Sequence, residues 1–443
     1  MALEQALREA VRAGRLPAGT ALPSSRVLAR DLGLARSTVT EAYAQLTAAG
    51  YLVARRGAGT WVGSGAAVGT VGGDEEPSAA ALRFDLRPGT PDLSSFPRAL
   101  WLRALRRALA QAGPAVFASG DPRGRPELRA ALATYLARAR GAVAPSSRLI
   151  VCNGFSQGLK LVCDVLRVRG ARRLGIEDPS VWLHPPIARA AGLEIVPFPV
   201  DDGGLIVDRL DAAAVDAVLV TPAHQFPLGA TMRPRRRSAL LAWAARHDAF
   251  VVEDDYDGEF RYDRRPVGAL QGLDPERVVY AGTAAKTLAP GVRLAWLALP
   301  PALLGPAVEI RSIADRYSPA LDQLALAQLI DAGDFDRHVR RMRTTYRRRR
   351  DRLITTIGQA TSQVRIRGVA AGLHAVLELP ERSTEQALLA LGEEHSIGLH
   401  GLDPYRHGTY SGPQALIVGY ATPPDHAFPA AMRALGALLA SGL

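Results

Sequence analysis

The sequence, 443 residues long, contains very little lysine. Of its 54 Lys and Arg residues, only Lys160 and Lys286 are lysines, so arginine supplies nearly all of the positive charge. An amine can lose its proton and attack a carbonyl, whereas a guanidinium cannot. A lysine kept among Gly, Thr and Ala in "GTAAKTLAPGVR" therefore suggests covalent chemistry, and Lys286 is the first catalytic or cofactor-binding candidate.

Long apolar runs and cysteines are scarce as well. No run of about 18 apolar residues occurs, and the N-terminal "MALEQALREAVRAGRLP" is charged and amphipathic, so neither a membrane span nor a signal peptide is indicated. The expected location is therefore the cytoplasm. In that reducing compartment Cys152 and Cys163 are expected to be buried thiols rather than a disulfide. The sequence predicts no metal site.

The positive charge is concentrated in two segments. Residues 1–63 carry eight Arg against four acidic residues, and residues 337–352 carry nine Arg against one Asp, in a chain of formal net charge +11. A localised basic excess favours a polyanion partner, with double-stranded DNA the first candidate. For residues 337–352, a solvated or intersubunit face of a long amphipathic helix is preferred to a second DNA contact.

Composition divides the chain into three parts. Residues 1–63 form a small basic module, residues 64–82 are rich in Gly, Ala and Ser as in a flexible linker, and residues 83–443 form one long domain. In this domain apolar runs such as "AVDAVLVTP" and "RVVYAGT" alternate with helical patterns, which predicts a mainly parallel sheet covered by helices. Ligands of such sheets bind beyond the carboxyl ends of the strands.

The N-terminal segment "LPSSRVLARDLGLARSTVTEAYAQLTAAGYLVARRGAGTWV" predicts a helix, a turn, a second helix and a hairpin. Ser24 or Ser25 can cap the first helix, and Gly33 lies in the turn. Polar side chains at the start of the second helix would read the major groove, while nearby arginines would meet phosphates. The predicted DNA-binding residues are Arg36, Ser37, Thr38 and Thr40 in the groove, and Arg26, Arg55 and Arg56 at the phosphates. A winged scaffold for protein contacts is the alternative.

This segment resembles the winged helix-turn-helix of the GntR family of bacterial regulators. The resemblance is carried by "GRLPAGTALPSSRVLARDLGLARSTVTEAYAQLTAAGYL" and covers nearly all of residues 1–62. It implies that the partner of this module is a double-stranded DNA operator.

Candidate cofactor residues follow two strands of the larger domain. "FVVEDDYDGEFRY" ends a buried strand in three consecutive acids, which are costly to bury unless they meet cations or protonated nitrogens. Asp254 and Tyr256 suit an aromatic cofactor with a basic ring nitrogen and a phenolate-like oxygen. Thr283 and Arg293, three residues before and seven after Lys286, suit a phosphate. This ordered set describes pyridoxal 5′-phosphate, whose aldehyde joins a lysine and whose pyridinium needs an acid partner.

Residues 84–443 look like a fold-type I aminotransferase, and their fusion to a GntR-type module is similar to the MocR subfamily of pyridoxal-phosphate-dependent transcriptional regulators. The motifs include "GDPRGRPELRAALATYLARARG", "TPAHQFPLGATM", "EDDYDGEFRY" and "GTAAKTLAPGVRLAWLALP". The resemblance implies an α/β fold class: a winged helix-turn-helix followed by a transferase domain with a mainly parallel central sheet and a smaller C-terminal α+β subdomain. Related folds build their site at a two-fold interface, so a homodimer is expected.

The resemblance also implies roles for the candidate residues. Lys286 would bond the cofactor aldehyde, Asp254 would pair with the pyridine nitrogen and Tyr256 with the ring hydroxyl. Arg293 and Thr283 would hold the phosphate, helped by the helix start at Gly154, Phe155 and Ser156, where free amides favour an anion. His224 stands at the strand end where related enzymes present a side chain to the ring. The alternative for His224 is a structural histidine in a turn.

Several positions depart from the family pattern around the cofactor. Ala285 stands where a serine usually precedes the lysine. Val181 followed by Trp182 stands where the pattern "EDPGY" has its aromatic, and Ser119 replaces the tyrosine that commonly reaches the phosphate of the partner subunit. The residue that stacks on the ring is therefore not identified.

One residue at the expected substrate-binding position also departs from the family pattern, and this departure bears on the function. Ile417 stands where aminotransferases carry an arginine for the substrate carboxylate, a clamp that would be lost unless Arg406 compensates. The favoured function is a DNA-binding regulator that senses an amine, an amino acid or vitamin B6 through pyridoxal phosphate on Lys286. A working aminotransferase with a DNA-binding appendage is the second hypothesis, and a regulator that no longer holds cofactor is the third.

Overall fold

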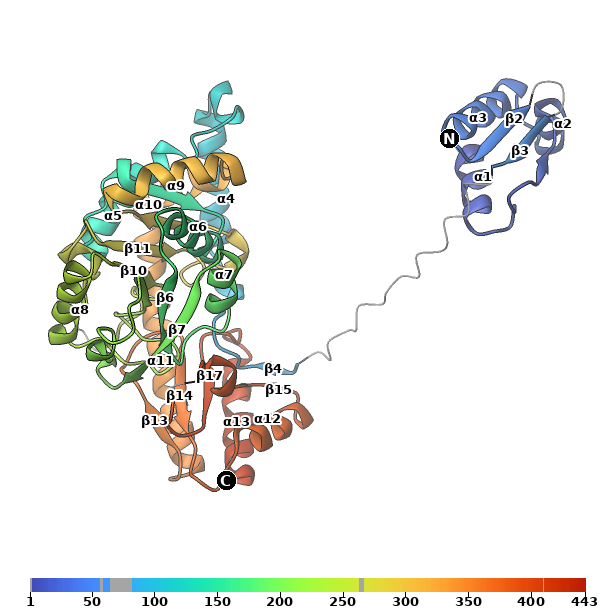
Figure 1. The fold of residues 1–443 in the computed structure, drawn as a ribbon. Helices are drawn as coiled ribbons and strands as arrows, with labels where there is room; N and C mark the ends of the chain where they lie inside the picture. The colour runs from blue at the N-terminus through green and yellow to red at the C-terminus, as the bar shows by residue number, and fades with distance from the viewer. Residues whose placement is uncertain (1, 56–58, 64–81, 263–266, 409) are drawn as a thin grey trace. The chain divides into compact units, whose positions relative to one another are not determined.

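The computed structural model describes residues 2–55, 59–63, 82–262, 267–408 and 410–443 (Figure 1). The chain divides into two compact units, Met1–Ala81 and Leu82–Leu443. The predicted linker, residues 64–82, lies outside the described residues except for Leu82.

The smaller unit is a winged helix-turn-helix. Ser24 caps the second helix by accepting a hydrogen bond from the Val27 amide at 3.4 Å, and Gly33 ends that helix with a positive φ of 64°. Val39, Tyr43 and Leu46, at helical spacing on the third helix, supply buried side chains of the core. Its elements are α1 (Ala2–Arg12), β1 (Ala21–Leu22), α2 (Ser25–Leu32), α3 (Arg36–Ala48), β2 (Leu52–Arg55) and β3 (Gly59–Val62), with the antiparallel strand order β1-β3-β2.

The larger unit is built on a central sheet with the strand order β5-β12-β11-β10-β9-β6-β7-β8. The pairs β11-β10, β10-β9, β9-β6 and β6-β7 are parallel, whereas β12 runs antiparallel to both of its neighbours. The carboxyl ends of β5, β10 and β11 therefore meet at one edge of the sheet. The strands are β5 (Leu149–Cys152), β6 (Arg173–Asp178), β7 (Glu194–Asp201), β8 (Gly204–Leu205), β9 (Ala217–Val220), β10 (Phe250–Asp255), β11 (Val278–Thr283) and β12 (Ala295–Ala298).

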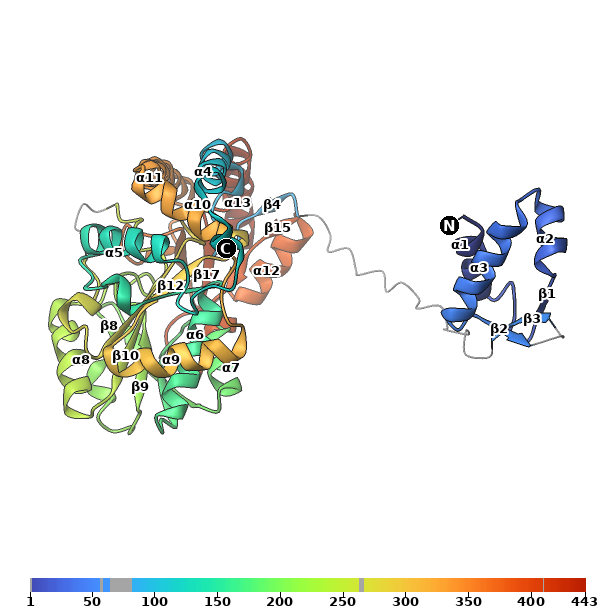
Figure 2. The ribbon, with the colours of Figure 1, turned by 90° about the horizontal axis from the view of Figure 1, so that it is seen from above.

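Helices cover both faces of this sheet, as Figure 2 shows from above. Strand side chains alternate between the two cores: Val252 packs with α6 and α9, whereas Val251 packs on the opposite face with α8. The same alternation sends Asp254 to the side of Val252 and its neighbours in sequence to the other side. The helices are α4 (Arg98–Gln111), α5 (Pro126–Arg140), α6 (Phe155–Val168), α7 (His184–Ala190), α8 (Pro234–Arg246), α9 (Pro301–Ala314) and α10 (Ala320–Asp331).

A C-terminal subdomain completes the larger unit. The long helix α11 (Asp334–Ala360) leads into an antiparallel sheet with the order β13-β14-β17-β16, which packs against α12 and α13. A short parallel pair joins β4 to β15, so the beginning of this unit is tied to its end. These elements are β4 (Phe84–Asp85), β13 (Arg365–Arg367), β14 (His374–Glu378), α12 (Glu385–Glu394), β15 (Ile397–Gly398), β16 (His400–Gly401), β17 (Ala415–Gly419) and α13 (Phe428–Gly442).

The predicted fold class is confirmed: a winged helix-turn-helix is followed by an α/β unit with a mostly parallel sheet and a smaller C-terminal subdomain. Cys152 and Cys163 are both free and buried, as predicted. Among the described residues, none of the helices combines the length and the apolar character needed to cross a membrane.

Candidate functional site

A cavity of about 270 Å³ opens where the carboxyl ends of β5, β10 and β11 meet. Most of the residues predicted from sequence to bind a cofactor lie in its wall, although they come from four separate segments. The predicted residues that line it are Gly154, Phe155, Ser156, Asp254, Tyr256, Thr283, Lys286 and Arg293.

The acids at the end of β10 point to different places. The Glu253 carboxylate accepts hydrogen bonds from the backbone amides of Leu270 and Gln271. Asp255 forms a buried ion pair with Arg140, in which Nε of Arg140 lies 2.6 Å from Oδ2 of Asp255. Asp254 faces the cavity instead, and its Oδ1 is buried without a hydrogen-bond partner among the described residues. Burial raises the pKa of Asp254 well above its usual range, with the charge of Lys286 acting in the opposite direction. An orphaned buried carboxyl oxygen of this kind fits the protonated ring nitrogen of a pyridine cofactor.

Lys286 follows β11 by three residues, and its amine donates a hydrogen bond to the carbonyl of Gly89. Burial lowers the pKa of Lys286, while the charge of Asp254 raises it. A lysine with a lowered pKa keeps more of its amine in the unprotonated, nucleophilic form. Ala285, which stands beside it, also lines the cavity.

The opposite end of the cavity is suited to a phosphate. Gly154 precedes α6 with φ of 85°, and a Cβ at this position would lie 2.7 Å from the guanidinium carbon of Arg293. Arg293 itself has a left-handed φ of 54°, and its Nη2 donates to the carbonyl of Asn153 at 2.6 Å. Such a backbone is uncommon for arginine and is found preferentially at ligand sites. Thr283 and the first amides of α6 complete this group of donors.

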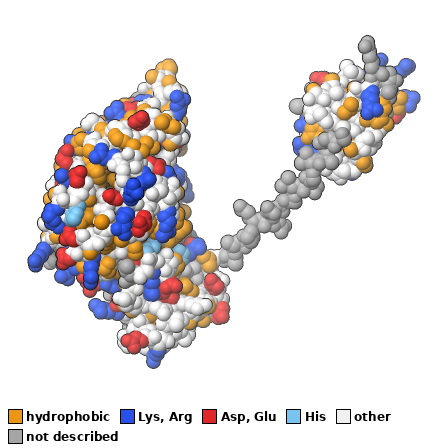
Figure 3. Space-filling view, viewed as in Figure 1, with side chains coloured by type: hydrophobic (Ala, Val, Ile, Leu, Met, Phe, Trp, Pro, Cys, Tyr) orange, Lys and Arg blue, Asp and Glu red, His pale blue; other side chains and the backbone are white. Residues whose placement is uncertain are grey.

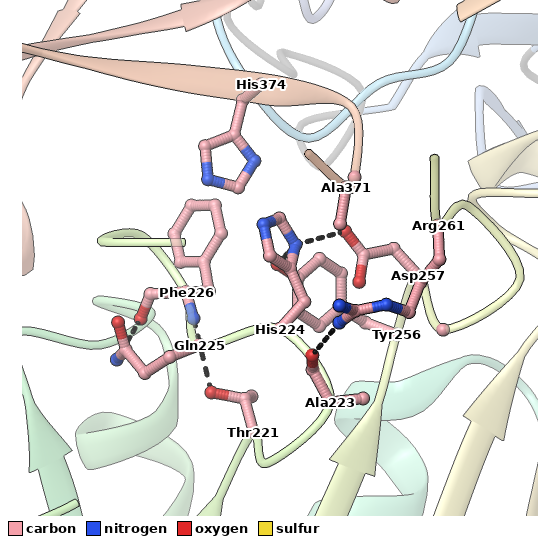
Figure 4. Close-up of polar contacts among 12 residues, drawn as sticks. Thr221, Ala223, His224, Gln225, Phe226, Tyr256, Asp257, Arg261, Ala371 and His374 are labelled. Carbon is pink, nitrogen blue, oxygen red and sulfur yellow. Dashed lines mark hydrogen bonds and ion pairs between the residues drawn. The ribbon is translucent and has the colours of Figure 1, made fainter. Parts of the chain in front are cut away.

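His224 differs from the other predicted residues because it does not line this cavity. It lies next to Tyr256, with its Nδ1 3.0 Å from the Tyr256 hydroxyl and 2.8 Å from Oδ2 of Asp257 (Figure 4). His224 is therefore not positioned to contact a ligand in the cavity directly. The loop after β9 turns the imidazole toward the end of β10 rather than into the opening.

Several cavity residues have no counterpart among the sequence predictions. His184, three residues after Val181 and the first residue of α7, is buried, packs its ring 5.4 Å from that of Phe155, and places Nε2 4.0 Å from Asp254. Burial lowers the pKa of His184 to about 3, so the ring is neutral. The position of His184 three residues beyond the expected aromatic was an available signal. No comparable local pattern marks the lining residues Pro88, Gly89, Phe226, Leu373, His374 and Tyr405, and Leu183, Pro290 and Leu294 complete the wall.

The positions that depart from the family pattern have distinct places. Val181 and Trp182 line the cavity, although Trp182 remains 54% exposed. Ser119 is exposed and outside the lining. Ile417 is fully buried in an apolar cluster that includes Phe226 and Tyr405.

Arg406 does not occupy the vacant clamp position. Its Nη2 lies 3.4 Å from Oε1 of Glu385, and Nη1 lies 3.6 Å from Asp403. Because these pairs hold the guanidinium outside the lining, this side of the cavity is apolar where it adjoins Ile417.

In the smaller unit, α3 begins at Arg36 and presents its first turns to solvent. Arg36, Ser37, Thr38 and Thr40 are exposed, whereas Val39 between them is buried. Arg26 on α2 and Arg55 on β2 are exposed too, and the Arg55 guanidinium lies 5.6 Å from the Trp61 ring centroid. Arg56 lies outside the described residues.

The arginine-rich segment 337–352 forms the first two-thirds of α11 and is not uniformly solvated. Arg349 is buried, with Nη2 2.7 Å from Asp92 and Nη1 bonded to the carbonyls of Ala421 and Pro423. On the face of the larger unit seen in Figure 3, basic side chains are interspersed with acidic ones. The exposed arginines of the segment are Arg337, Arg340, Arg341, Arg343, Arg347, Arg348 and Arg352.

Comparisons with known proteins agree with this architecture. The profile of the family described as aminotransferase class I and II matches residues 89–406, and that of bacterial regulatory proteins, gntR family, matches residues 2–62. The probable rhizopine catabolism regulatory protein MocR of Rhizobium meliloti is 34% identical, over 95% of this chain and 89% of its own. The pyridoxine biosynthesis transcriptional regulator PdxR of Corynebacterium glutamicum is also 34% identical, over 85% of this chain and 82% of its own. An archaeal alanine:glyoxylate aminotransferase shares the fold of 82% of this chain and 92% of its own, with a TM-score of 0.75 at 24% identity.

The contact between Gly154 and Arg293 yields a prediction. Gly154→Ala should displace the Arg293 guanidinium and raise the dissociation constant of pyridoxal phosphate about tenfold, as expected for a misplaced charged donor. Gly170→Ala is the matched control, because Gly170 lies just beyond the other end of α6 with φ of 93° and no atom within 4 Å of its added Cβ. Absorbance titration of cofactor-free protein measures both constants. Equal constants for the two variants would show that Arg293 does not hold the phosphate.

Proposed function

The chain belongs to the MocR subfamily of GntR-type transcriptional regulators, and we propose that it binds operator DNA under the control of pyridoxal 5′-phosphate held at Lys286. The observation that carries this proposal is the cavity, in which Lys286, the orphaned Asp254 oxygen and the Gly154–Arg293 cradle surround one space.

The residues of the cavity match the parts of the cofactor. Asp254 would hold the ring nitrogen, Tyr256 the ring hydroxyl, and Arg293 with Thr283 and the first turn of α6 the phosphate. When bound, pyridoxal phosphate supplies an aldehyde that condenses with primary amines and a ring that withdraws electrons. Lys286 presents its amine from the wall of the cavity and can also hold or release a proton there.

The effector would enter the same cavity as an amine, an amino acid or the vitamin itself. The wall beside Ile417, with Phe226 and Tyr405, is apolar. A carboxylate placed there would lose hydration without gaining a cation from this wall. We therefore favour an effector whose end facing Ile417 is uncharged.

Regulation requires that the two units communicate. A homodimer would present two winged helix-turn-helix units to repeated half-sites, and ligand binding would change operator affinity by favouring one arrangement of the dimer. Apolar side chains exposed on the larger unit are available for self-association, and they include Leu102, Leu109, Phe117, Ile313 and Tyr317.

A working aminotransferase with a DNA-binding appendage is the second candidate, favoured by the shared placement of Lys286 and Asp254 in the cavity. Sustained turnover that depends on a keto acid would identify it. A regulator without sustained turnover would show exchange of amines but no such consumption.

Replacement of each lysine tests the cofactor assignment. We expect the purified protein to absorb between about 300 and 500 nm when pyridoxal phosphate is bound, and Lys286→Ala to abolish the visible band, because the link to the lysine is part of the chromophore. Lys160→Ala is the matched control, since Lys160 is the other lysine and pairs with Asp164 at 2.6 Å on α6. A band that survives in Lys286→Ala, or that never forms in the unaltered protein, would refute the assignment.

Two variants test whether Arg36 contacts bases and Arg55 contacts phosphates. Arg36→Ala should reduce discrimination between the operator and altered sequences by about 1 to 3 kcal/mol. Arg55→Ala should instead weaken binding to all sequences similarly and reduce the salt dependence. Titration of labelled duplexes at several salt concentrations measures both effects. An unchanged sequence preference in Arg36→Ala would remove this residue from the major groove.

A further inference from the structure

His224 and Asp257 form a buried pair next to Tyr256, outside the lining of the cavity (Figure 4). His224 follows β9 and Asp257 follows β10, and these strands are parallel neighbours, so the fold brings their ends together. Nδ1 of His224 lies 2.8 Å from Oδ2 of Asp257 and 3.0 Å from the hydroxyl oxygen of Tyr256. One nitrogen thus faces two oxygens.

The chemistry of the three groups decides where their protons lie. An ionised carboxylate only accepts hydrogen bonds, so Nδ1 must carry a proton in order to bond Asp257. The same N–H then lies against the oxygen of Tyr256, and the tyrosine proton cannot be donated to His224. It is directed instead toward the Asp257 carboxylate or into the cavity.

Tyr256 is held as a neutral phenol in this setting. Burial, together with the charges of Asp257 and Asp254, raises the pKa of Tyr256 well above its ordinary value. A neutral phenol in the cavity wall can donate a hydrogen bond to an anionic oxygen of a ligand, whereas a phenolate could not.

The pair is fixed in place by the segment that leads into β14. Gly372 has φ of 76°, and a Cβ on it would overlap the His224 ring and lie 2.6 Å from Oδ2 of Asp257. On another side, a Cβ on Gly229 would lie 3.5 Å from Nε2 of His224. This packing leaves the imidazole no room to turn away from Asp257 and Tyr256.

Other titratable or charged groups surround the three residues. The His374 ring centre lies 5.3 Å from that of His224, and burial lowers the pKa of His374 to about 4, so it is neutral. The remaining groups that act on this cluster come from β10 and the segment after it, from the segment after β11, from α11 and from the end of β17: Asp254, Tyr262, Lys286, Arg350 and Tyr420.

We propose that the His224–Asp257 pair positions Tyr256, fixing its phenol as a hydrogen-bond donor to the ring oxygen of the cofactor without touching the cofactor itself. This inference rests on the proposed function, in which the ligand is pyridoxal phosphate. It gives His224 a different role from the direct ring contact expected from sequence. A donor at the ring oxygen favours the ionised form of that oxygen, so the pair sets the pH at which the bound cofactor changes its absorbance.

The test compares the pH midpoint of the visible band in single and double variants of the full chain. Tyr256→Phe removes the donor and should raise the midpoint by about one pH unit, because the ionised ring oxygen loses a charge-assisted hydrogen bond. His224→Gln should raise it in the same direction by a smaller amount, whereas Asp257→Asn is not used because the Asp257 charge also raises the pKa of Lys286 directly. The double variant Tyr256→Phe/His224→Gln should match Tyr256→Phe alone, since His224 acts only through the phenol.

The control is another histidine–aspartate pair of the same chain. His247 follows the last residue of α8, and its Nε2 lies 2.9 Å from Oδ1 of Asp211 in an exposed pair. Neither residue lines the cavity, so His247→Gln should leave the midpoint unchanged. His224→Leu, which removes both ring nitrogens, answers the question if His224→Gln does not fold, which thermal unfolding of the cofactor-free protein reports.

An unchanged midpoint in a folded His224→Gln or His224→Leu would overturn the proposal. So would a further shift on adding His224→Gln to Tyr256→Phe, because the histidine would then act independently of the phenol. Absence of any visible band in the unaltered protein is a different result and refutes the proposed function instead.

Discussion

Asp254 imposes the main physical constraint on the cavity, because one oxygen of its buried carboxyl group has no hydrogen-bond partner among the described residues. A carboxyl group buried at the end of a central strand is costly, and the other acids of this segment avoid the cost by meeting Arg140 or backbone amides. Asp254 faces a cavity that Lys286 and His184 share. The parallel order of the strands makes this possible, because it brings the ends of β5, β10 and β11 to one edge. The structure therefore maintains a polar site that a ligand with a protonated nitrogen would complete.

The residues that sequence could identify are those that follow predicted strands directly. Lys286, Asp254 and Thr283 lie within three residues of a strand end, so the rule that strand ends converge was sufficient to group them. The fold class followed for the same reason, since alternating strand and helix patterns leave few topologies.

Residues that depend on loop direction or on distant segments could not be placed in this way. His224 stands after a strand as expected, but the turn that follows aims its ring at Asp257 rather than at the cavity. His374 and Tyr405 enter the cavity from the C-terminal subdomain, more than 80 residues beyond Lys286, and no local pattern marks them. Arg349 belongs to an arginine run whose pattern predicts a solvated helix face. Its guanidinium is nevertheless buried, because it donates a hydrogen bond to Asp92, 257 residues away. In each case the partner that fixes the side chain is remote in sequence.

Regulation by the cofactor requires that the cavity of the larger unit controls the affinity of the smaller unit for DNA. The most direct measurement is the dissociation constant of the full chain for a duplex selected from random sequences, with and without pyridoxal phosphate, in the unaltered protein and in Lys286→Ala. We expect at least about a fivefold difference in the unaltered protein and none in the variant. Equal constants with and without cofactor in the unaltered protein, or a difference that persists in Lys286→Ala, would contradict this regulation.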